Sequence, residues 1–273
     1  MLIDADAFRD FERRAHDRVA RTYGGFFEPV TAVTIPALLG AAGVGGGCRV
    51  LDVASGPGAV AAAAAARGAV VIGVDLSPEM LAVARARHPG LDFREGDAER
   101  LPFAEDAFDA VVCNFGLGHF ARPERAAAEF RRVLAPGGRV ALSWWDVPAR
   151  ARVNGVFFDA MAAAGARPPA AVPAGPPPFR FADEAELRAL LTIAGFTDPH
   201  VRTLGWTHAI GSVEAWWEGG LGSLARASAA VVHQPAEVQA RIRAAFDRLA
   251  DDYRGDAGLV VPVSAKIATG RRP

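Results

Sequence analysis

Lysine is almost absent from the sequence, and this scarcity excludes several kinds of enzyme site. The only lysine is Lys266. A phosphate-binding P-loop requires Gly-Lys-Ser or Gly-Lys-Thr, which the sequence around Lys266 does not contain. A pyridoxal enzyme needs a lysine in a pocket, whereas Lys266 lies in an alternating, strand-like stretch. Neither Tyr23 nor Tyr253 has a lysine four residues later, which excludes the Tyr-x-x-x-Lys pair of short-chain dehydrogenases.

Cysteine, net charge and long apolar runs are also scarce. Cys48 and Cys113 provide neither a disulfide framework nor a metal-ligand spacing. The 30 basic and 31 acidic residues give a formal charge of −1, which does not favour a nucleic-acid partner. No run approaches the ~20 apolar residues that span a bilayer, and the charged N-terminus lacks the apolar core of a signal peptide. We therefore expect a cytoplasmic protein that binds neither nucleic acid nor membrane.

Strands and helices alternate through most of the 273 residues, half of which are hydrophobic. Helical segments of 10–15 residues between strands are typical of a parallel sheet. The pattern predicts an α/β fold with a Rossmann-like, doubly wound, mostly parallel seven-stranded sheet. The expected strands are residues 49–54, 69–75, 91–95, 109–114, 139–144, 200–205 and 259–269.

Helical segments flank this sheet pattern. Residues 6–43 read as two helices separated at Gly24-Gly25, and residues 206–255 form a helical insertion before the last strand. Six prolines make residues 168–178 an extended connector. Asp183 with Glu186 is a capping pair that opens a further helix.

A glycine-rich corner follows the first expected strand. Asp52 ends that strand, and Gly56-Pro-Gly58 leads into a helix, where glycines let the backbone approach a ligand and helix N–H groups face an anion. Asp75 ends the next strand, where its carboxylate can accept both hydroxyls of a ribose. Gly96-Asp97 follows the third strand. These groups share the edge where open α/β sheets bind ligands.

Two interpretations of this corner compete. Residues 56–61 satisfy G-x-G-x-x-A, so an NAD-dependent oxidoreductase is one alternative. However, four ordered motifs, VLDVASGPG, VIGVDLSPEML, FREGDAERLPFAEDAFDAVVCNFGLGHF and RVLAPGGRVALSWW, together resemble the class I S-adenosylmethionine-dependent methyltransferases. The resemblance is greatest to the ubiquinone/menaquinone-biosynthesis type and its specialised-metabolite relatives. It covers residues 48–146 well and the rest only in general layout.

The resemblance implies S-adenosylmethionine as cofactor and S-adenosylhomocysteine as product. It also implies different roles for different segments of the chain. It implies one methyltransferase domain over residues 1–273, with a helical lid at 1–47, a cofactor-binding core at 48–146 and a C-terminal part at 147–273. The C-terminal part includes a substrate cap at about residues 205–255.

The resemblance also assigns roles to individual residues. Asp52 and the loop from Ala54 through Gly56 to Gly58 would hold the methionine part, although Ala54 departs from the family's usual glycine. The remaining cofactor-binding positions would serve the ribose (Asp75), the adenine (Leu76, Met80, Asp97 and Ala98) and the surroundings of the sulfonium (Asn114 and Phe115).

Two residues are candidates for a catalytic base. Methyl transfer is an in-line displacement for which the protein supplies alignment and, where needed, a base. His119 follows the fourth strand beside the expected methyl position, and histidine titrates near neutral pH. It could equally line the adenosyl pocket. Tyr23, in the expected lid, is the other candidate and could instead be a packed aromatic residue. We find no metal-ligand motif and expect no metal.

The sequence says less about the methyl acceptor than about the cofactor. Trp144-Trp145, Trp206 and Trp216-Trp217 could line one cavity or belong to the core. Aromatic walls suggest a small-molecule acceptor that is bulky or aromatic, such as a specialised metabolite of a bacterium, methylated on carbon, oxygen or nitrogen. A methyltransferase fold with a non-methylating role is a further alternative, and either a monomer or a homodimer fits the sequence.

Overall fold

Five parallel strands with their crossover helices form one half of the molecule. The computed structural model describes residues 3–256 and 258–273, so the first two residues of the predicted lid lie outside the described residues, as does residue 257. The parallel strands are β1 (Arg49–Val53), β2 (Val70–Asp75), β3 (Asp92–Glu95), β4 (Phe108–Asn114) and β5 (Leu134–Trp145). The helices that connect them are α3 (Ala59–Ala66), α4 (Pro78–Arg87) and α5 (Pro123–Val133), with a short 3₁₀ turn η1 (Leu117–His119) before α5.

The strands that close the sheet are long and antiparallel. The sheet order is β3-β2-β1-β4-β5-β8-β6, with β8 (Gly258–Arg271) antiparallel to both β5 and β6 (Thr197–Ile210). These seven strands confirm the predicted mostly parallel α/β sheet. A two-residue strand, β7 (Arg254–Gly255), pairs with the start of β8. Strand β6 reaches Ile210, so the helical insertion begins later than residue 206 and Trp206 belongs to the sheet.

Both faces of the parallel sheet are covered, which explains why its strands are apolar on both sides. Leu51 and Val111 pack in the same cluster as residues of α5 and of α7 (Glu184–Ile193). Their neighbours Val50 and Val112 face the opposite way, against α2 (Ile35–Ala41), α3 and α4.

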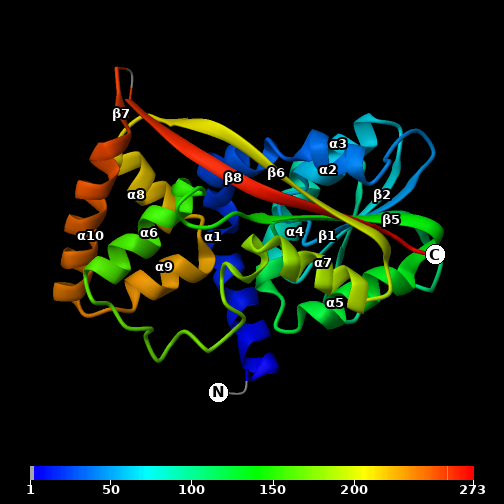
Figure 1. The fold of residues 1–273 in the computed structure, drawn as a ribbon, viewed down its shortest axis with the longest axis horizontal. Coiled ribbons are helices and arrows are strands. Elements are labelled where there is room, and N and C mark those ends of the chain that lie inside the picture. The colour runs from blue at the N-terminus through cyan, green and yellow to red at the C-terminus, as the bar shows by residue number, and fades with distance from the viewer. Residues whose placement is uncertain (1–2, 257) are drawn as a thin grey trace.

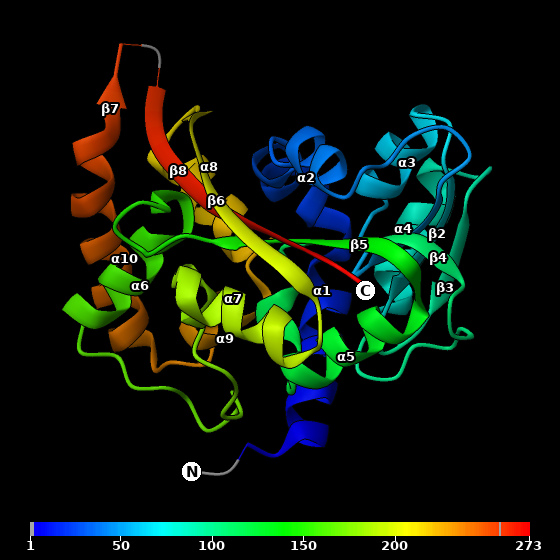
Figure 2. The ribbon, with the colours of Figure 1, turned by 45° about the vertical axis from the view of Figure 1, so that its right-hand side comes forward.

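A group of helices occupies the far end of β6 and β8. Figures 1 and 2 show α6 (Arg152–Ala163), α8 (Val213–Leu221), α9 (Ala225–Val232) and α10 (Ala236–Ala250) gathered there, away from the parallel strands. The helix α1 (Ala5–Ala32) runs between this group and the parallel half. Two further 3₁₀ turns are η2 (Arg180–Ala182), just before α7, and η3 (Asp251–Tyr253), directly after α10.

The predicted helix break at Gly24-Gly25 is wrong. Helix α1 continues through both glycines, and the chain breaks instead at Val33-Thr34, before Pro36 in the first turn of α2. A Cβ at position 24 would lie 2.2 Å from the Arg87 guanidinium, and Arg87 forms a 2.6 Å ion pair with Glu28. The missing side chain thus lets α1 and α4 pack closely. This packing outweighs the cost of about 1 kcal/mol for a glycine inside a helix.

The structure also tests two other local predictions, a turn and a helix cap. The predicted turn at residues 136–138 forms the irregular start of β5, where the register with β4 shifts and Gly137 has a φ of +78°. Asp183 caps α7 as predicted, because its carboxylate accepts the Ala185 N–H at 2.8 Å, but Glu186 pairs with Arg180 instead.

Within the residues that the structure describes, no single helix is long and apolar enough to cross a membrane. The pair α1 and α2 meets that criterion only when the two are taken together across a 57° bend.

Candidate functional site

The carboxyl ends of β1, β2 and β4 border one cavity, which α1 and the segment around α9 also line. Most of the residues predicted for the cofactor line this cavity, and so do both candidate bases. The predicted residues that line it are Ala54, Gly56, Asp75, Leu76, Met80, Asp97, Ala98, Asn114, Phe115, His119 and Tyr23. The sheet edge therefore brings together side chains from four separate motifs, as expected for an open α/β sheet.

The loop between β1 and α3 bends through three left-handed residues. Ala54, Gly56 and Gly58 have φ values of +55°, +51° and +91°. A Cβ added to Gly56 would meet no atom within 4 Å, whereas one at Gly58 would lie 2.7 Å from Phe93. Gly56 thus provides open space at the cavity wall, while Gly58 allows α3 to pack closely on β3. Ala54 adopts a backbone conformation that costs a non-glycine residue roughly 1–2 kcal/mol.

Asp75 connects this loop to the next strand. Its carboxylate accepts the Gly56 N–H and the Ser77 N–H, each at 2.8 Å. Burial raises the pKa of Asp75, and these two N–H donors offset part of that effect. The carboxylate is therefore fixed in direction and retains lone pairs for a ligand in the cavity.

Asp97 and Asn114 lie in two further parts of the wall. Asp97 accepts the Glu99 N–H at 2.8 Å and lies 3.4 Å from the Arg9 guanidinium of α1. The Asn114 side-chain oxygen accepts from the hydroxyls of Thr34 at 2.7 Å and Ser143 at 2.6 Å. Both positions therefore link the sheet edge to the N-terminal helical segment.

Asp52 differs from its predicted position. Its side chain is only 1 % exposed and does not line the cavity, and neither carboxyl oxygen has a hydrogen-bond partner among the described residues. Burial raises the pKa of Asp52 well above its ordinary value, and the nearby Ala61 N–H offsets this only in part. Asp52 is thus a buried carboxyl group beneath the glycine loop.

The two candidate bases have different surroundings. The His119 Nδ1 atom lies 3.0 Å from the Glu12 carboxylate, and His119 lines the cavity beside Trp144. Tyr23 packs against Phe27, and burial raises its pKa to about 12. A phenol with this pKa is a poor base at neutral pH, because almost none of it is ionised.

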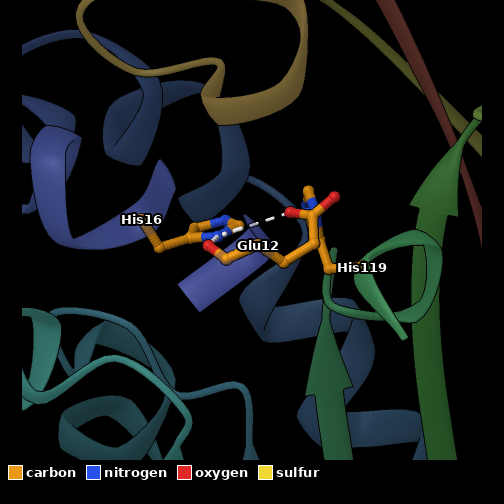
Figure 3. Close-up of side chains that lie close together, drawn as sticks. All are labelled: Glu12, His16 and His119. Carbon is orange, nitrogen blue, oxygen red and sulfur yellow. Dashed lines mark hydrogen bonds and ion pairs between the residues drawn. The ribbon is translucent and has the colours of Figure 1, made fainter. Parts of the chain in front are cut away.

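Sequence reasoning missed two ionisable residues of α1, Glu12 and His16. They lie one helical turn apart and line the cavity, and together with His119 they form a cluster whose potential metal-ligand atoms lie within 4.8 Å of one another (Figure 3). The i, i+4 spacing on an otherwise apolar helix face was the available signal. Only the fold brings His119 to the same place.

The tryptophans do not share one cavity. Trp144 and Trp145 line it, whereas Trp206, Trp216 and Trp217 do not. Trp216 is fully buried and its indole N–H donates to the Val153 carbonyl at 2.9 Å, as in a packed core. The segment between β6 and β8 thus contributes most of its aromatic residues to the helical group.

Four buried polar residues line the cavity with a side-chain atom that has no hydrogen-bond partner among the described residues, namely Glu12, Ser55, Asn154 and Ser223. Asn154 of α6 is 3 % exposed and Ser223 is 4 % exposed. The Asn154 side-chain oxygen and the Ser223 hydroxyl have no hydrogen-bond partner among the described residues. Since buried polar atoms are almost always paired, these two atoms are candidates for ligand contacts.

Comparison with known proteins identifies the core of the chain. Residues 51–142 match the family described as "Methyltransferase domain". The chain is 50% identical over 91 residues to a demethylmenaquinone methyltransferase of Chlorobaculum parvum, covering 33% of this chain and 38% of that protein. Residues 51–142 are therefore similar to methyltransferase domains, including that of a demethylmenaquinone methyltransferase.

A longer match is to a protein whose name states no function. An uncharacterized protein of Mycobacterium bovis is 41% identical over 152 residues, which cover 53% of this chain and 56% of that protein. The chain thus spans about half of the length of this relative.

Solved structures share the fold of the methyltransferase domain and its extensions. The YcgJ protein of Bacillus subtilis matches 88% of this chain and 98% of its own, with 21% identity and a TM-score of 0.55. A phosphoethanolamine N-methyltransferase of Haemonchus contortus, in complex with S-adenosylhomocysteine, matches 97% of this chain and 60% of its own, with 19% identity and a TM-score of 0.60.

Proposed function

We propose that this protein transfers a methyl group from S-adenosylmethionine to a small-molecule acceptor bound in the same cavity. The observation that carries the proposal is the open space at Gly56, at the cavity wall that Asp75 and Asp97 share. A side chain at position 56 would project into that space, so the backbone there suits close contact with a ligand. The methyltransferase domain identified over residues 51–142 makes S-adenosylmethionine the matching ligand.

The cavity residues divide among the parts of this ligand. In our proposal, Asp75 accepts the ribose hydroxyls, and Leu76 and Met80 flank the adenine. Asp97 accepts the adenine amino group beside the Ala98 N–H. The segment from Ala54 to Gly56 holds the methionine part, and Asn114 and Phe115 border the sulfonium. Asp52 and Gly58 support the loop from behind, because neither lines the cavity.

The methyl transfer requires that the acceptor is aligned with the methyl group and that one proton is removed from the acceptor. The acceptor's lone pair forms a bond to the methyl carbon while the carbon–sulfur bond breaks and its electron pair stays on sulfur, which gives S-adenosylhomocysteine. The acceptor's proton passes to His119, which lines the cavity and carries a nitrogen that Glu12 does not engage. A positioned base of this kind contributes about 10²–10⁴-fold to the rate. Tyr23 serves instead as an aromatic residue of the lid.

The chemistry of the wall favours a flat acceptor with polar substituents. Trp144, Trp145, Phe158 and Phe179 provide aromatic surface. Asn154 and Ser223 provide an unpaired carbonyl oxygen and an unpaired hydroxyl within the same cavity. We therefore propose a bulky or aromatic small molecule, such as a specialised metabolite, as the acceptor. Carbon, oxygen and nitrogen remain possible sites of methylation.

An NAD-dependent oxidoreductase fits less well. The dinucleotide-binding sheet consists of parallel strands in the order 3-2-1-4-5-6. Here β8 is antiparallel and lies between β5 and β6. This observation favours the methyltransferase.

Calorimetric titration tests the proposal directly. We expect S-adenosylmethionine and S-adenosylhomocysteine to bind, and NADH not to bind. Methyl-labelled S-adenosylmethionine, incubated with a panel of aromatic phenols, amines and carbon nucleophiles, then reports transfer into an extractable product. Binding of NADH without binding of S-adenosylmethionine would overturn the proposal. Cofactor binding with an acceptor that is converted without label would support a non-methylating role.

A further inference from the structure

A buried carboxylate of the N-terminal helix contacts the candidate base. Glu12 is 2 % exposed, and its Oε2 atom lies 3.0 Å from the Nδ1 atom of His119, which is 107 positions away in the sequence (Figure 3). An ionised carboxylate can only accept hydrogen bonds, so His119 donates from Nδ1–H. This bond leaves Nε2 as the nitrogen of His119 that carries the free lone pair.

The surrounding charges keep Glu12 ionised. Burial raises the pKa of Glu12, but His119, His16 and the Arg226 guanidinium outweigh burial, so the net shift is downward. Burial and His119 lower the pKa of His16, which favours its neutral form, so its charge helps Glu12 only where His16 is protonated. Its Nδ1–H donates to the Glu12 carbonyl at 2.8 Å, and its ring meets that of His119 edge-on at 4.6 Å.

We propose that Glu12 is a positioning residue that fixes His119 in the Nδ1–H tautomer, with Nε2 free to take the acceptor's proton. The inference rests on the proposed role of His119 as the base. After proton transfer, both ring nitrogens carry hydrogen and the imidazolium is positive. The Glu12 carboxylate stabilises this charge from the Nδ1 side without taking the proton. The aspartate of a Ser-His-Asp triad does the same for its histidine.

Ionisable groups on three elements lie near Glu12 and His119 and affect the protonation of this pair. Glu12 and His16 come from α1, Asp75 from the end of β2 and Arg226 from α9. Asp75 favours a positive imidazole, whereas Arg226 opposes it. Because Glu12 alone contacts the His119 ring through a hydrogen bond among these groups, its removal has the largest effect.

The same three side chains could instead bind a divalent metal ion, since a carboxylate and two imidazoles are suitable ligands. Two observations favour the hydrogen-bonded arrangement. Both Nδ1 atoms already donate to Glu12, one to its carboxylate and one to its carbonyl. Arg226 also supplies positive charge close to the carboxylate, which weakens the attraction for a metal cation. Metal binding is therefore an outcome that the experiment must exclude.

The experiment is ¹⁵N NMR of the histidine rings in the full-length protein and in Glu12→Gln, with His119 assigned by comparison with His119→Gln. We expect the original protein to show an Nδ1-protonated neutral ring. In Glu12→Gln we expect a mixture of the two neutral tautomers, because the carboxylate that accepts the Nδ1–H is gone. Glu28→Gln is the matched control, since Glu28 is another α1 carboxylate at the cavity but pairs with Arg87. It should leave the His119 signals unchanged.

Three results would overturn the positioning role. The first is an unchanged His119 tautomer in a Glu12→Gln protein whose thermal unfolding shows that it is folded. The second is an equal change in Glu28→Gln. The third is stoichiometric calorimetric binding of Zn²⁺ that is lost in both His16→Ala and His119→Ala.

The proposed function can fail separately from this inference. If no acceptor is methylated but the ring signals respond to Glu12→Gln as expected, the positioning holds and the methyl-transfer proposal is wrong. If methyl transfer occurs, Glu12→Gln should lower kcat and shift its acidic limb to lower pH. Its calorimetric affinity for S-adenosylhomocysteine should stay the same.

Discussion

The Asp75 carboxylate accepts the backbone N–H of Gly56 at 2.8 Å, across the gap between the first two strands of the sheet. The residue predicted to bind the ribose therefore also holds the glycine loop in place. Because the same carboxylate accepts the Ser77 N–H, it links the loop, the end of β2 and the start of α4. A ligand that contacts Asp75 thus contacts a group whose orientation is already fixed, which lowers the entropy cost of binding.

Replacing Asp75 by alanine should weaken cofactor binding strongly. The variant loses the acceptors for the ribose hydroxyls and the bond that orients Gly56, which should cost roughly 1.5–3 kcal/mol of binding free energy. Calorimetric titration with S-adenosylhomocysteine measures the effect. Asp92→Ala is the control, because Asp92 is exposed at the other end of β3 and pairs with Arg94. An unchanged affinity in Asp75→Ala would refute the ribose assignment.

Replacing Gly56 by valine should abolish cofactor binding while the protein still folds. The left-handed backbone at position 56 costs a non-glycine residue roughly 1–2 kcal/mol, and the side chain would project into the cavity. Gly165→Val is a matched control, since Gly165 has a φ of +65° and a Cβ there also meets no atom within 4 Å. Gly165 does not line the cavity, so its variant should lose similar stability and keep its affinity for S-adenosylhomocysteine. Equal affinities in the two variants would contradict the predicted contact.

Replacing Asp52 by asparagine should change how stability depends on pH. Burial raises the pKa of Asp52 in the folded protein above its ordinary value of 3.8, so the folded state binds more protons than the unfolded chain between these two pKa values. The free energy of unfolding therefore falls as pH rises through this interval, by up to about 1.4 kcal/mol per pH unit. Asp52→Asn lacks this dependence.

Urea unfolding of the original protein and of Asp52→Asn between pH 4 and 8 measures how the stability of each depends on pH. The stability of Asp52→Asn relative to the original protein should increase with pH. A constant difference would mean that Asp52 ionises normally when the protein is folded.

Replacing Asn154 by leucine should stabilise the protein and impair acceptor binding. The Asn154 side-chain oxygen is buried without a partner, so an apolar residue of similar size should raise the free energy of unfolding by about 1 kcal/mol. Asn114→Leu is the contrasting variant. It removes an amide whose oxygen accepts two hydroxyl groups and whose nitrogen donates to the Thr31 carbonyl, so it should lose stability.

Thermal unfolding measures the change in stability of Asn154→Leu, and the KM for the acceptor measures the change in acceptor binding. For Asn154→Leu we expect KM to rise about tenfold or more while the affinity for S-adenosylhomocysteine is unchanged. A loss of stability in Asn154→Leu would show that the Asn154 amide is paired within the protein.

The parallel half of the sheet was predictable because its information is local. Apolar strands, glycines at the first corner and acidic residues at strand ends lie within short motifs between residues 49 and 97. Any chain with this alternation brings the carboxyl ends of its parallel strands to one edge. The motifs therefore predicted the part of the cavity wall at the sheet edge, including Gly56, Asp75 and Asp97.

The errors occurred where tertiary contacts outweigh local preference. Gly24-Gly25 is a typical helix break in isolation, yet α1 continues because Arg87 of α4 packs against Gly24. The local sequence does not distinguish the five tryptophans, but only Trp144 and Trp145 lie at the end of a strand, β5, that reaches the cavity. For Asp52, burial beneath neighbouring elements keeps the carboxyl group out of the cavity lining.

The sequence by itself determined the α/β class, the mostly parallel sheet and the edge of that sheet where the predicted ligand residues lie, since these follow from periodicity and turn residues over short stretches. Tertiary structure alone decided which distant groups meet at that edge. Glu12 and His119 are 107 positions apart, and no local pattern relates them. They meet because α1 runs between the parallel strands and the helical group (Figure 1), where the burial of its apolar face fixes its position. Hydrophobic packing thus positioned a carboxylate beside an imidazole, and that contact gives His119 its environment.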